Sequence, residues 1–215
     1  MPMAIKDLAN VKGFKTTEGS PLYSERVAQK DDQMVARLRA AGALFIGKTN
    51  TPEFGLGSNT FNPVYGKTKN PYDLTRTCGG SSGGAAVALA TRMLSISDGS
   101  DMMGSLRNPA AWNNVYGLRP TWGLVPPEPS GEIFLSQLST LGPMARSPKD
   151  LALLLDVQAN HFDNKSYVLQ SKSFWNFTAQ PRMEGIKIGW LGDWGGTLAF
   201  LSLIHISEPT RQLQI

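Results

Sequence analysis

The sequence is poor in the residues that build disulfide, zinc and histidine-dependent sites. Its 215 residues include one cysteine, Cys78, and two histidines, His161 and His205. A single cysteine excludes an internal disulfide framework and is typical of a reducing compartment, so we expect a cytoplasmic location. Because no ligand-spacing motif accompanies these residues, we expect no metal site and no cofactor.

Long apolar runs and blocks of like charge are also missing. No run of about 18 apolar residues occurs, and the N-terminus lacks the basic and apolar regions of a secretory signal. The formal net charge is +4, but the basic residues are scattered; Lys67 and Lys69 lie close together without forming a longer block. We therefore expect neither membrane insertion nor nucleic-acid binding.

Apolar periodicity predicts alternating helices and strands, which is typical of an α/β protein. The clearest helix start is Ser147-Pro148, because a serine cap precedes proline and Asp150 follows three residues after the cap. Residues 55–80 are predicted to be loop-rich. Helices are predicted at 33–41, at about 84–93 and from residue 148 onward, and strands at 1–6, 43–46, 94–97, 115–118 and 186–191.

Residues 42–49, GALFIGKT, match the phosphate-loop pattern G-x-x-x-x-G-K-[ST]. A phosphate loop follows a strand and leads into a helix that begins at the lysine. Here a predicted helix precedes Gly42, the four central residues favour a strand, and Pro52 disfavours a helix after Lys48. We interpret the match as coincidental: the segment is expected to be a buried apolar strand that binds no nucleotide, with Lys48 in a structural role.

A second glycine-rich region has the composition of a catalytic site. Residues 79–84, GGSSGG, lead into an apolar helix, and the segment 98–109, DGSDMMGSLRNP, places Ser105 24 residues after Ser81. Glycines allow close approach of backbone to ligand, and a helix start directs free N–H groups toward the same place. A flexible linker would not lead straight into an apolar helix. Because no histidine lies near either serine, a lysine is the natural base.

These stretches resemble the signature of the amidase signature family. The similar segments are GGSSGGAAVALA, SDGSDMMGSLRNPAAWNNVYGLRPTWGLVP, MAIKDLANVKGFKTTEGS, GKTNTPEFGLGSNTFNPVYGKTKNPYDL and LSTLGPMARSPKDLALLL, which together cover about residues 2–197. The resemblance implies a mixed β-sheet flanked by helices, incomplete at both ends, with a partial amidase signature domain over residues 1–198. Residues 199–215 resemble a translated sequencing adapter more than a natural segment; a divergent surface extension is the alternative.

The resemblance implies that a carboxylic amide is hydrolysed through a serine acyl-enzyme. It assigns Ser105 as the nucleophile and Ser81 as the bridging serine, which in the family usually follows a cis peptide. It assigns the base to Lys6 of the IKD motif rather than to Lys48. An unperturbed lysine has a pKa of about 10.4, so burial would have to lower its pKa by several units.

The substrate side of the site is also implied by the resemblance. The backbone N–H groups of Met102, Met103 and Gly104 are expected to hold the oxyanion, and Ser82 is expected beside the substrate. The neighbouring Asp101 and Arg107 are expected to brace the loop rather than react. The family usually has paired glycines where this chain has Met103-Gly104, and a methionine at positive φ would be strained.

The function stays open at this stage. Only five residues precede Lys6, and a residue so near a free terminus is expected to fray and stay solvated. The candidates are an amidase acting on a small-molecule amide, the glutamine-amidase subunit of a tRNA-dependent amidotransferase, and an inactive truncated fragment. A homodimer is compatible with the resemblance for the full-length protein.

Overall fold

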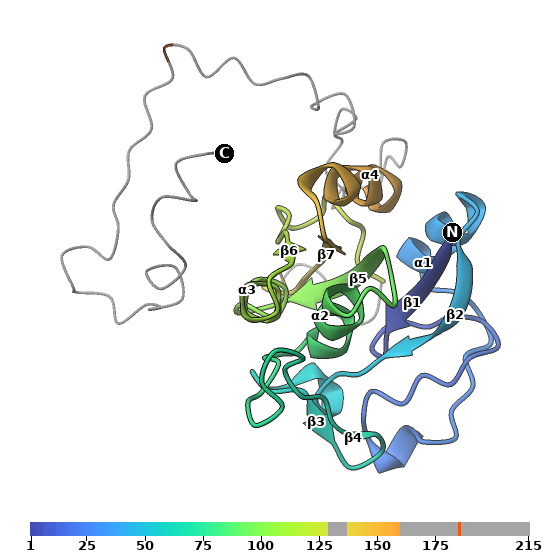
Figure 1. Cartoon of the computed structure of the whole chain (residues 1–215). Helices are drawn as coiled ribbons and strands as arrows, with labels where there is room; N and C mark the ends of the chain where they lie inside the picture. Colours follow the sequence, from blue (N-terminus) through green and yellow to red (C-terminus); the bar gives the residue numbers. More distant parts are fainter. Residues whose placement is uncertain (129–136, 160–184, 186–215) are drawn as a thin grey trace. The chain divides into compact units, whose positions relative to one another are not determined.

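The structure, a computed structural model, describes residues 1–128, 137–159 and 185 (Figure 1). Apart from Gly185, these residues lie in the first of two compact units, Met1–Thr178. The strand expected at 186–191 and the tail at 199–215 lie outside the described residues.

The described elements alternate between helices and strands, which confirms the α/β expectation (Figure 1). The strands fall into three small sheets: a parallel pair β1–β2, an antiparallel pair β3–β4 and an antiparallel sheet of order β5-β7-β6. The strands are β1 (Pro2–Lys6), β2 (Leu44–Thr49), β3 (Phe61–Asn62), β4 (Gly66–Lys67), β5 (Ile96–Asp101), β6 (Tyr116–Gly117) and β7 (Thr140–Ala145). The helices are η1 (Pro21–Tyr23), α1 (Gln33–Ala40), η2 (Glu53–Gly55), α2 (Gly83–Ala90), α3 (Arg107–Trp112) and α4 (Pro148–Gln158).

Strand β1 separates two hydrophobic cores. Met3 and Ile5 pack with side chains of α1 and α4, whereas Ala4, between them in sequence, packs with side chains of α2 and α3. Because side chains alternate between the two faces of a strand, Lys6 lies on the same face as Ala4. The pleat therefore directs the lysine toward the start of α2, where the GGSSGG segment ends.

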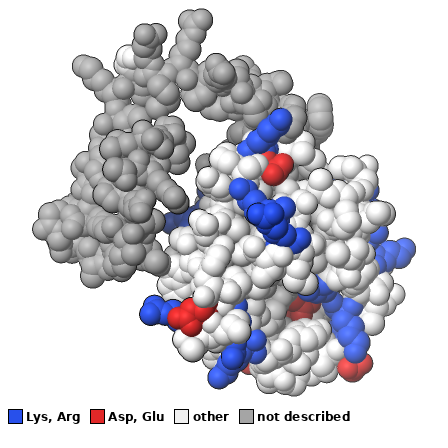
Figure 2. All heavy atoms as spheres, in the orientation of Figure 1, with Lys and Arg blue, Asp and Glu red and all other residues white. Residues whose placement is uncertain are grey.

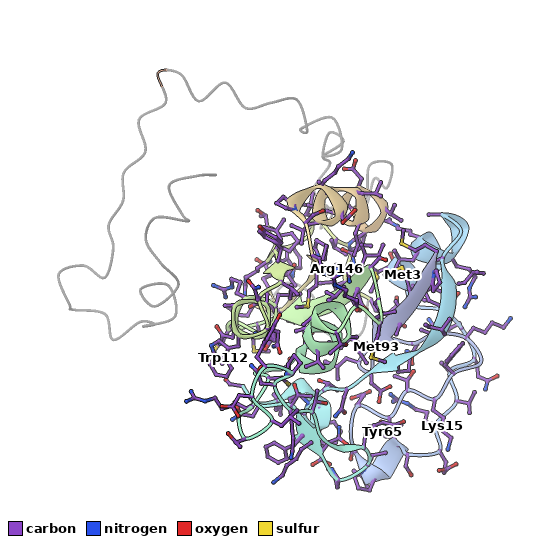
Figure 3. All side chains as sticks on the ribbon, viewed as in Figure 1. Met3, Lys15, Tyr65, Met93, Trp112 and Arg146 are labelled. Carbon is purple, nitrogen blue, oxygen red and sulfur yellow. The ribbon has the colours of Figure 1, made fainter. Side chains whose placement is uncertain are left out.

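Helices α4 and α1 begin within a few residues of their predicted positions, α4 at a serine cap and α1 with an apolar stripe. Ser147 caps α4, and its Oγ accepts a hydrogen bond from the backbone N–H of Asp150 at 3.1 Å. Helix α1 begins after Asp32, and its buried residues are spaced as a helical stripe. The C-terminal end of α2 is held by Arg146, marked in Figure 3, which donates to the carbonyl groups of Leu89 and Leu94.

The expectation that residues 43–46 form a buried strand is only half correct. Strand β2 is present, and Phe45 packs against the core. Leu44 and Ile46, on the opposite face, are 65% and 61% exposed. The difference arises because β2 has β1 as its sheet partner and only one of its faces is covered by described residues. Apolarity in the sequence therefore did not mean burial on both faces.

Strand β7 and helix α3 are among the elements that the periodicity missed. Strand β7 contains Gly142 and Pro143, two residues that weaken a strand pattern in sequence. Helix α3 is only six residues long and contains Pro109 in its first turn, where a proline is tolerated. Strand β5 was predicted at 94–97 but runs from Ile96 to Asp101, because the polar residues 97–101 are buried and paired with β7.

The described surface shows a dispersed pattern of charge. On the face seen in Figure 2, Lys and Arg side chains lie in separate groups, several beside acidic residues. Ion pairs join Arg39 to Asp31 at 2.6 Å and Lys15 to Glu25 at 2.8 Å. Within residues 1–128 and 137–159, no helix is long and apolar enough to cross a membrane.

Candidate active site

Lys6 lies in a buried cluster of serine hydroxyls. Its side chain is 1% exposed, and its Nζ donates to Ser81 Oγ at 2.7 Å, to Ser82 Oγ at 2.9 Å and to Ser100 Oγ at 2.9 Å. The expectation that Lys6 frays and stays solvated is wrong. Strand β1 pairs with β2 along its whole length, with Lys6 opposite Thr49, so the strand holds the lysine despite its place near the terminus.

Burial gives Lys6 the properties of a base. It lowers the pKa of the lysine from 10.5 to about 7, while the carboxylates of Asp98 and Asp101 act in the opposite direction. Asp98 is itself 1% exposed, and its Oδ1 accepts the backbone N–H of Lys6 at 3.0 Å. Burial raises the pKa of Asp98 to about 6, against the lowering effect of that N–H and of nearby lysines. Close to half of such lysines would be neutral at about pH 7.

The GGSSGG segment is held by the hydroxyl of Thr60 and by close packing on Asn50. Thr60 Oγ1 donates to the carbonyl of Gly79 at 2.8 Å and accepts the N–H of Gly83 at 3.1 Å. A Cβ added at Gly84 would overlap the backbone of Asn50, so only glycine lets α2 start this close to the end of β2. The Gly80–Ser81 peptide is cis, as the family resemblance implies.

Ser82 lies behind the site rather than beside the expected substrate. Its side chain is fully buried, its Oγ donates to the carbonyl of Ser100 at 3.3 Å, and it accepts from Lys6 Nζ and from the N–H of Ser100. Its backbone N–H donates to the carbonyl of Ser105 at 3.1 Å. This geometry corrects the expectation for Ser82: it positions Lys6 and joins the two serine segments.

The loop before Ser105 is organised by one buried carboxylate. Asp101 Oδ1 accepts the backbone N–H of Gly104 at 2.7 Å, and Asp101 Oδ2 accepts that of Leu106 at 3.0 Å. Arg107 and Arg119 each lie 3.1 Å from the same carboxylate. Burial opposes ionisation of Asp101, but these donors hold its pKa well below its usual range. Asp101 and Arg107 thus brace the loop, as the sequence predicted.

The same contacts correct the expected set of oxyanion donors. The N–H of Gly104 donates to Asp101 and is therefore not free to bind an oxyanion. The buried carboxylate of Asp101 requires such donors, because a buried charge without partners is strongly unfavourable. Gly104 also has the positive φ of the loop, +114°, and Met103 does not, so the methionine is not strained there. The N–H groups of Met102, Met103 and Ser105 remain as candidate donors.

Ser81 and Ser105 open onto one cavity of about 190 Å³, which Ser100 also lines. Ser105 is partly exposed, whereas Ser81 is 2% exposed. Among the described residues, no hydrogen bond joins the two hydroxyls of Ser81 and Ser105. A second cavity, of about 280 Å³, adjoins Lys6 and is lined in part by Asp98 and Ser100. The three predicted catalytic side chains are thus gathered at one site.

Sequence reasoning missed Asp98 and Ser100. Both flank Gly99 on β5, directly before the loop that ends at Ser105. Their polar type inside a buried strand was the signal that could have indicated them, because buried polar groups need partners. Within the described residues, no cluster of three or more His, Cys, Asp and Glu side chains could hold a metal ion.

Lys48 supports the fold beside this site. Its Nζ donates to the carbonyl of Ala9 at 2.7 Å and to Thr16 Oγ1 at 3.0 Å, and it lies 3.2 Å from Asp7 Oδ1. It belongs to β2, so residues 44–49 are a strand and not a phosphate-binding loop. These contacts agree with the structural role expected for this lysine.

Comparison with known proteins gives the family. The model of the family described as Amidase matches residues 1–199. The chain belongs to this amidase family. It is 42% identical over 190 residues to the A subunit of glutamyl-tRNA(Gln) amidotransferase from Deinococcus deserti, covering 88% of this chain and 39% of that protein. The chain thus spans about two fifths of the length of the curated relatives it matches.

Solved structures of family members are similar in fold. A native peptide amidase from Stenotrophomonas maltophilia is 36% identical with a TM-score of 0.74, covering 83% of this chain and 38% of that chain. A bacterial aryl acylamidase of the amidase signature family is 34% identical with a TM-score of 0.75, covering 82% of this chain and 37% of that chain. The fold expected from the sequence is therefore confirmed for the part that these chains share.

Proposed function

We propose that the full-length protein hydrolyses the C–N bond of a carboxylic amide through an acyl-enzyme on Ser105. One observation supports this most directly: Lys6, buried with a pKa lowered to about 7, donates to Ser81 Oγ at 2.7 Å, and Ser81 shares a cavity with Ser105. A lysine of ordinary pKa would be almost wholly charged at neutral pH and could not accept a proton.

The first half of the reaction is a proton relay. Neutral Lys6 takes the hydroxyl proton of Ser81, Ser81 takes that of Ser105, and Ser105 Oγ bonds to the carbonyl carbon. The negative charge on the carbonyl oxygen is held by the candidate N–H donors of Met102, Met103 and Ser105, each contributing up to about 3 kcal/mol. The proton returns through Ser81 to the leaving nitrogen as the C–N bond breaks.

The second half repeats the relay with water. A water molecule gives its proton to Ser81 and bonds to the acyl carbon, and the ester bond to Ser105 breaks with return of the proton to Ser105 Oγ. Ser82 and Ser100 keep Lys6 Nζ in place throughout, because they accept its other N–H bonds at 2.9 Å. The substrate is a small-molecule amide, and the cytoplasmic location and a homodimer remain predictions.

The test is active-site labelling of the full-length protein. A fluorophosphonate reagent should add its mass to Ser105, and Ser105→Ala should abolish both labelling and amide turnover. Lys6→Ala and Ser81→Ala should slow labelling of Ser105 strongly. Ser58→Ala is the matched control, because Ser58 lines the same cavity, whereas the described hydroxyls bonded to Lys6 Nζ are those of Ser81, Ser82 and Ser100. Labelling at Ser81 or Ser82 that persists in Ser105→Ala would overturn the assignment.

A second candidate is a glutamine-amidase subunit of a tRNA-dependent amidotransferase. It is favoured by the names of the curated relatives, which are 42% identical in Deinococcus deserti and 49% identical in Thermus thermophilus. The Ser105 chemistry would be the same, with ammonia from glutamine as the product. Ammonia release from glutamine, measured with and without candidate partner subunits, separates the two functions: strong dependence on a partner supports this second candidate.

A further inference from the structure

Apolar side chains surround the mouth of the cavity that holds Ser105. They are Leu8, Phe54, Leu56, Met102 and Met103, and they come from three separate segments of the chain. Every other described residue that lines this cavity is a serine or a glycine, so no described lining residue is charged. The wall around the proposed nucleophile is thus carbon-rich and neutral.

These side chains do not belong to the hydrophobic core. Leu56 and Met103 are 71% and 82% exposed, and Phe54 and Met102 are about two fifths exposed, at 40% and 43%. Isolated exposed apolar residues need no explanation, but a convergent group at the mouth of a pocket indicates a binding surface. Covering them with an apolar ligand would remove this surface from water, which stabilises the complex.

The backbone is arranged to present two of these side chains. Phe54 has a left-handed backbone, with φ 53° and ψ 17°, held by its N–H bond to the carbonyl of Glu18 at 2.7 Å. A bulky residue in this region costs on the order of 1 kcal/mol or more, and such strain clusters at binding sites. Leu8 packs so closely on Gly55 that a Cβ at that position would lie 2.6 Å from Leu8 Cδ1.

We infer that the neutral, apolar cavity formed by Leu8, Phe54, Leu56, Met102 and Met103 selects uncharged amides that have an apolar aliphatic or aryl group. Free glutamine has an ammonium and a carboxylate group, and neither would find a counter-charge among the described lining residues. Burying an unpaired charge is strongly unfavourable. This inference rests on the proposed function, since it names the substrate class of the Ser105 site.

The first test compares two substrates in the full-length protein. Pentanamide has the five-carbon chain of glutamine, with hydrogen in place of the ammonium group and methyl in place of the carboxylate, so the two substrates differ in charge at equal chain length. We expect kcat/KM for pentanamide to exceed that for glutamine by about 100-fold or more, as expected when a site must desolvate unpaired charge. Equal or faster hydrolysis of glutamine, with or without partner subunits, would overturn the inference while leaving the Ser105 chemistry in place.

The second test locates the selectivity. From acetamide to hexanamide, kcat/KM should rise by about fourfold for each added methylene that the cavity covers. Met103→Gln and Leu56→Gln should each flatten this slope, because each replaces an apolar side chain of the cavity lining with a polar one. Met93→Gln is the matched control, because Met93, labelled in Figure 3, is 75% exposed and is not among the residues that line the cavity. An unchanged slope in both cavity variants would overturn the inference.

The two kinds of failure can be told apart. If Ser105 is labelled and acetamide is hydrolysed, the proposed function stands. The chain-length slope of kcat/KM and the ratio of pentanamide to glutamine hydrolysis then test the substrate class alone. If no amide is hydrolysed and Ser105 is not labelled, the proposed function fails and the substrate class fails with it.

Discussion

Replacement of Asp98 by asparagine tests the electrostatics of the proposed base. Asp98 and Lys6 are both 1% exposed, and Asp98 Oδ1 accepts the backbone N–H of Lys6 at 3.0 Å. Asparagine keeps an oxygen in this position and nearly the same volume, so Asp98→Asn removes the charge with little change in shape. Asp101, which is paired with two arginines, also acts on Lys6, and Lys48 on β2 acts on Asp98. Two further carboxylates, Asp32 and Glu128, line the cavity that adjoins Lys6.

The expected effect is a lower pKa for Lys6. If roughly 6 Å, the length of a lysine side chain, separates the two charges, an effective dielectric constant of about 20 gives an attraction of about 3 kcal/mol, or about two pKa units. Water in the adjoining cavity of about 280 Å³ screens part of this attraction, so we expect a shift of about one unit. The carboxylate favours the charged lysine, and its removal therefore favours the neutral base.

The assay is the pH dependence of kcat/KM for a neutral amide in the full-length protein. Activity should rise as Lys6 loses its proton, with a midpoint near 7 in the wild type and about one unit lower in Asp98→Asn. The wild-type profile should be fitted above about pH 6, where more than half of Asp98 is ionised, whereas the Asp98→Asn profile, which has no carboxyl here, should be followed to lower pH. Glu128→Gln is the control, since Glu128 lines the same second cavity but is bonded to Lys30 and to the N–H of Gln33. An unchanged midpoint, or one moved to higher pH, would refute the reasoning.

Three further predictions concern the rest of the chain. Lys48→Ala should lower the free energy of unfolding by about 3 kcal/mol, because the buried Asp7 loses its ion-pair partner and keeps, among the described residues, only its hydrogen bonds from Thr17. Equilibrium dialysis of the wild type should detect no ATP binding at residues 42–49. Cys78 should react with iodoacetamide only after denaturation, since it is buried and burial raises its pKa to about 11; rapid alkylation of the native protein would contradict this. The 215-residue chain alone should aggregate in size-exclusion chromatography and turn over amides poorly, because Leu44 and Ile46 are exposed on β2; turnover comparable to the full-length protein would show this to be wrong.

Local features of the sequence were enough to place most elements. The serine cap of α4, the apolar stripe of α1 and the glycine-to-helix transition of α2 each depend on neighbouring residues, so the sequence predicts them to within a few residues. The same local reasoning did not predict strand β7 or helix α3. Gly142 and Pro143 in β7 and Pro109 in α3 disfavour these elements in the local sequence, and the surrounding structure stabilises them.

The surroundings of the proposed base could not be predicted in the same way. The partners of Lys6 lie 75, 76 and 94 residues away along the chain, at Ser81, Ser82 and Ser100. Position near the terminus suggested a solvated lysine, but burial is decided by the parallel pairing of β1 with β2 and by the packing of α2 against β1. Neither contact is visible in the local sequence, so the expectation from chain position was wrong for Lys6.

Met103-Gly104, which precedes Ser105 where the family usually has two glycines, connects the structure of the loop with the lining of the cavity. A glycine pair would give a flexible loop with no side chain, whereas here only Gly104 adopts positive φ, and Asp101 fixes the turn by accepting its N–H. The position before it is then free of conformational demands and can bear a side chain. Met103 occupies this position. Its backbone N–H remains a candidate oxyanion donor, and its side chain lines the cavity. One residue can thus contribute to the shared chemistry through its backbone and to substrate choice through its side chain, which is why Met103→Gln should flatten the chain-length slope.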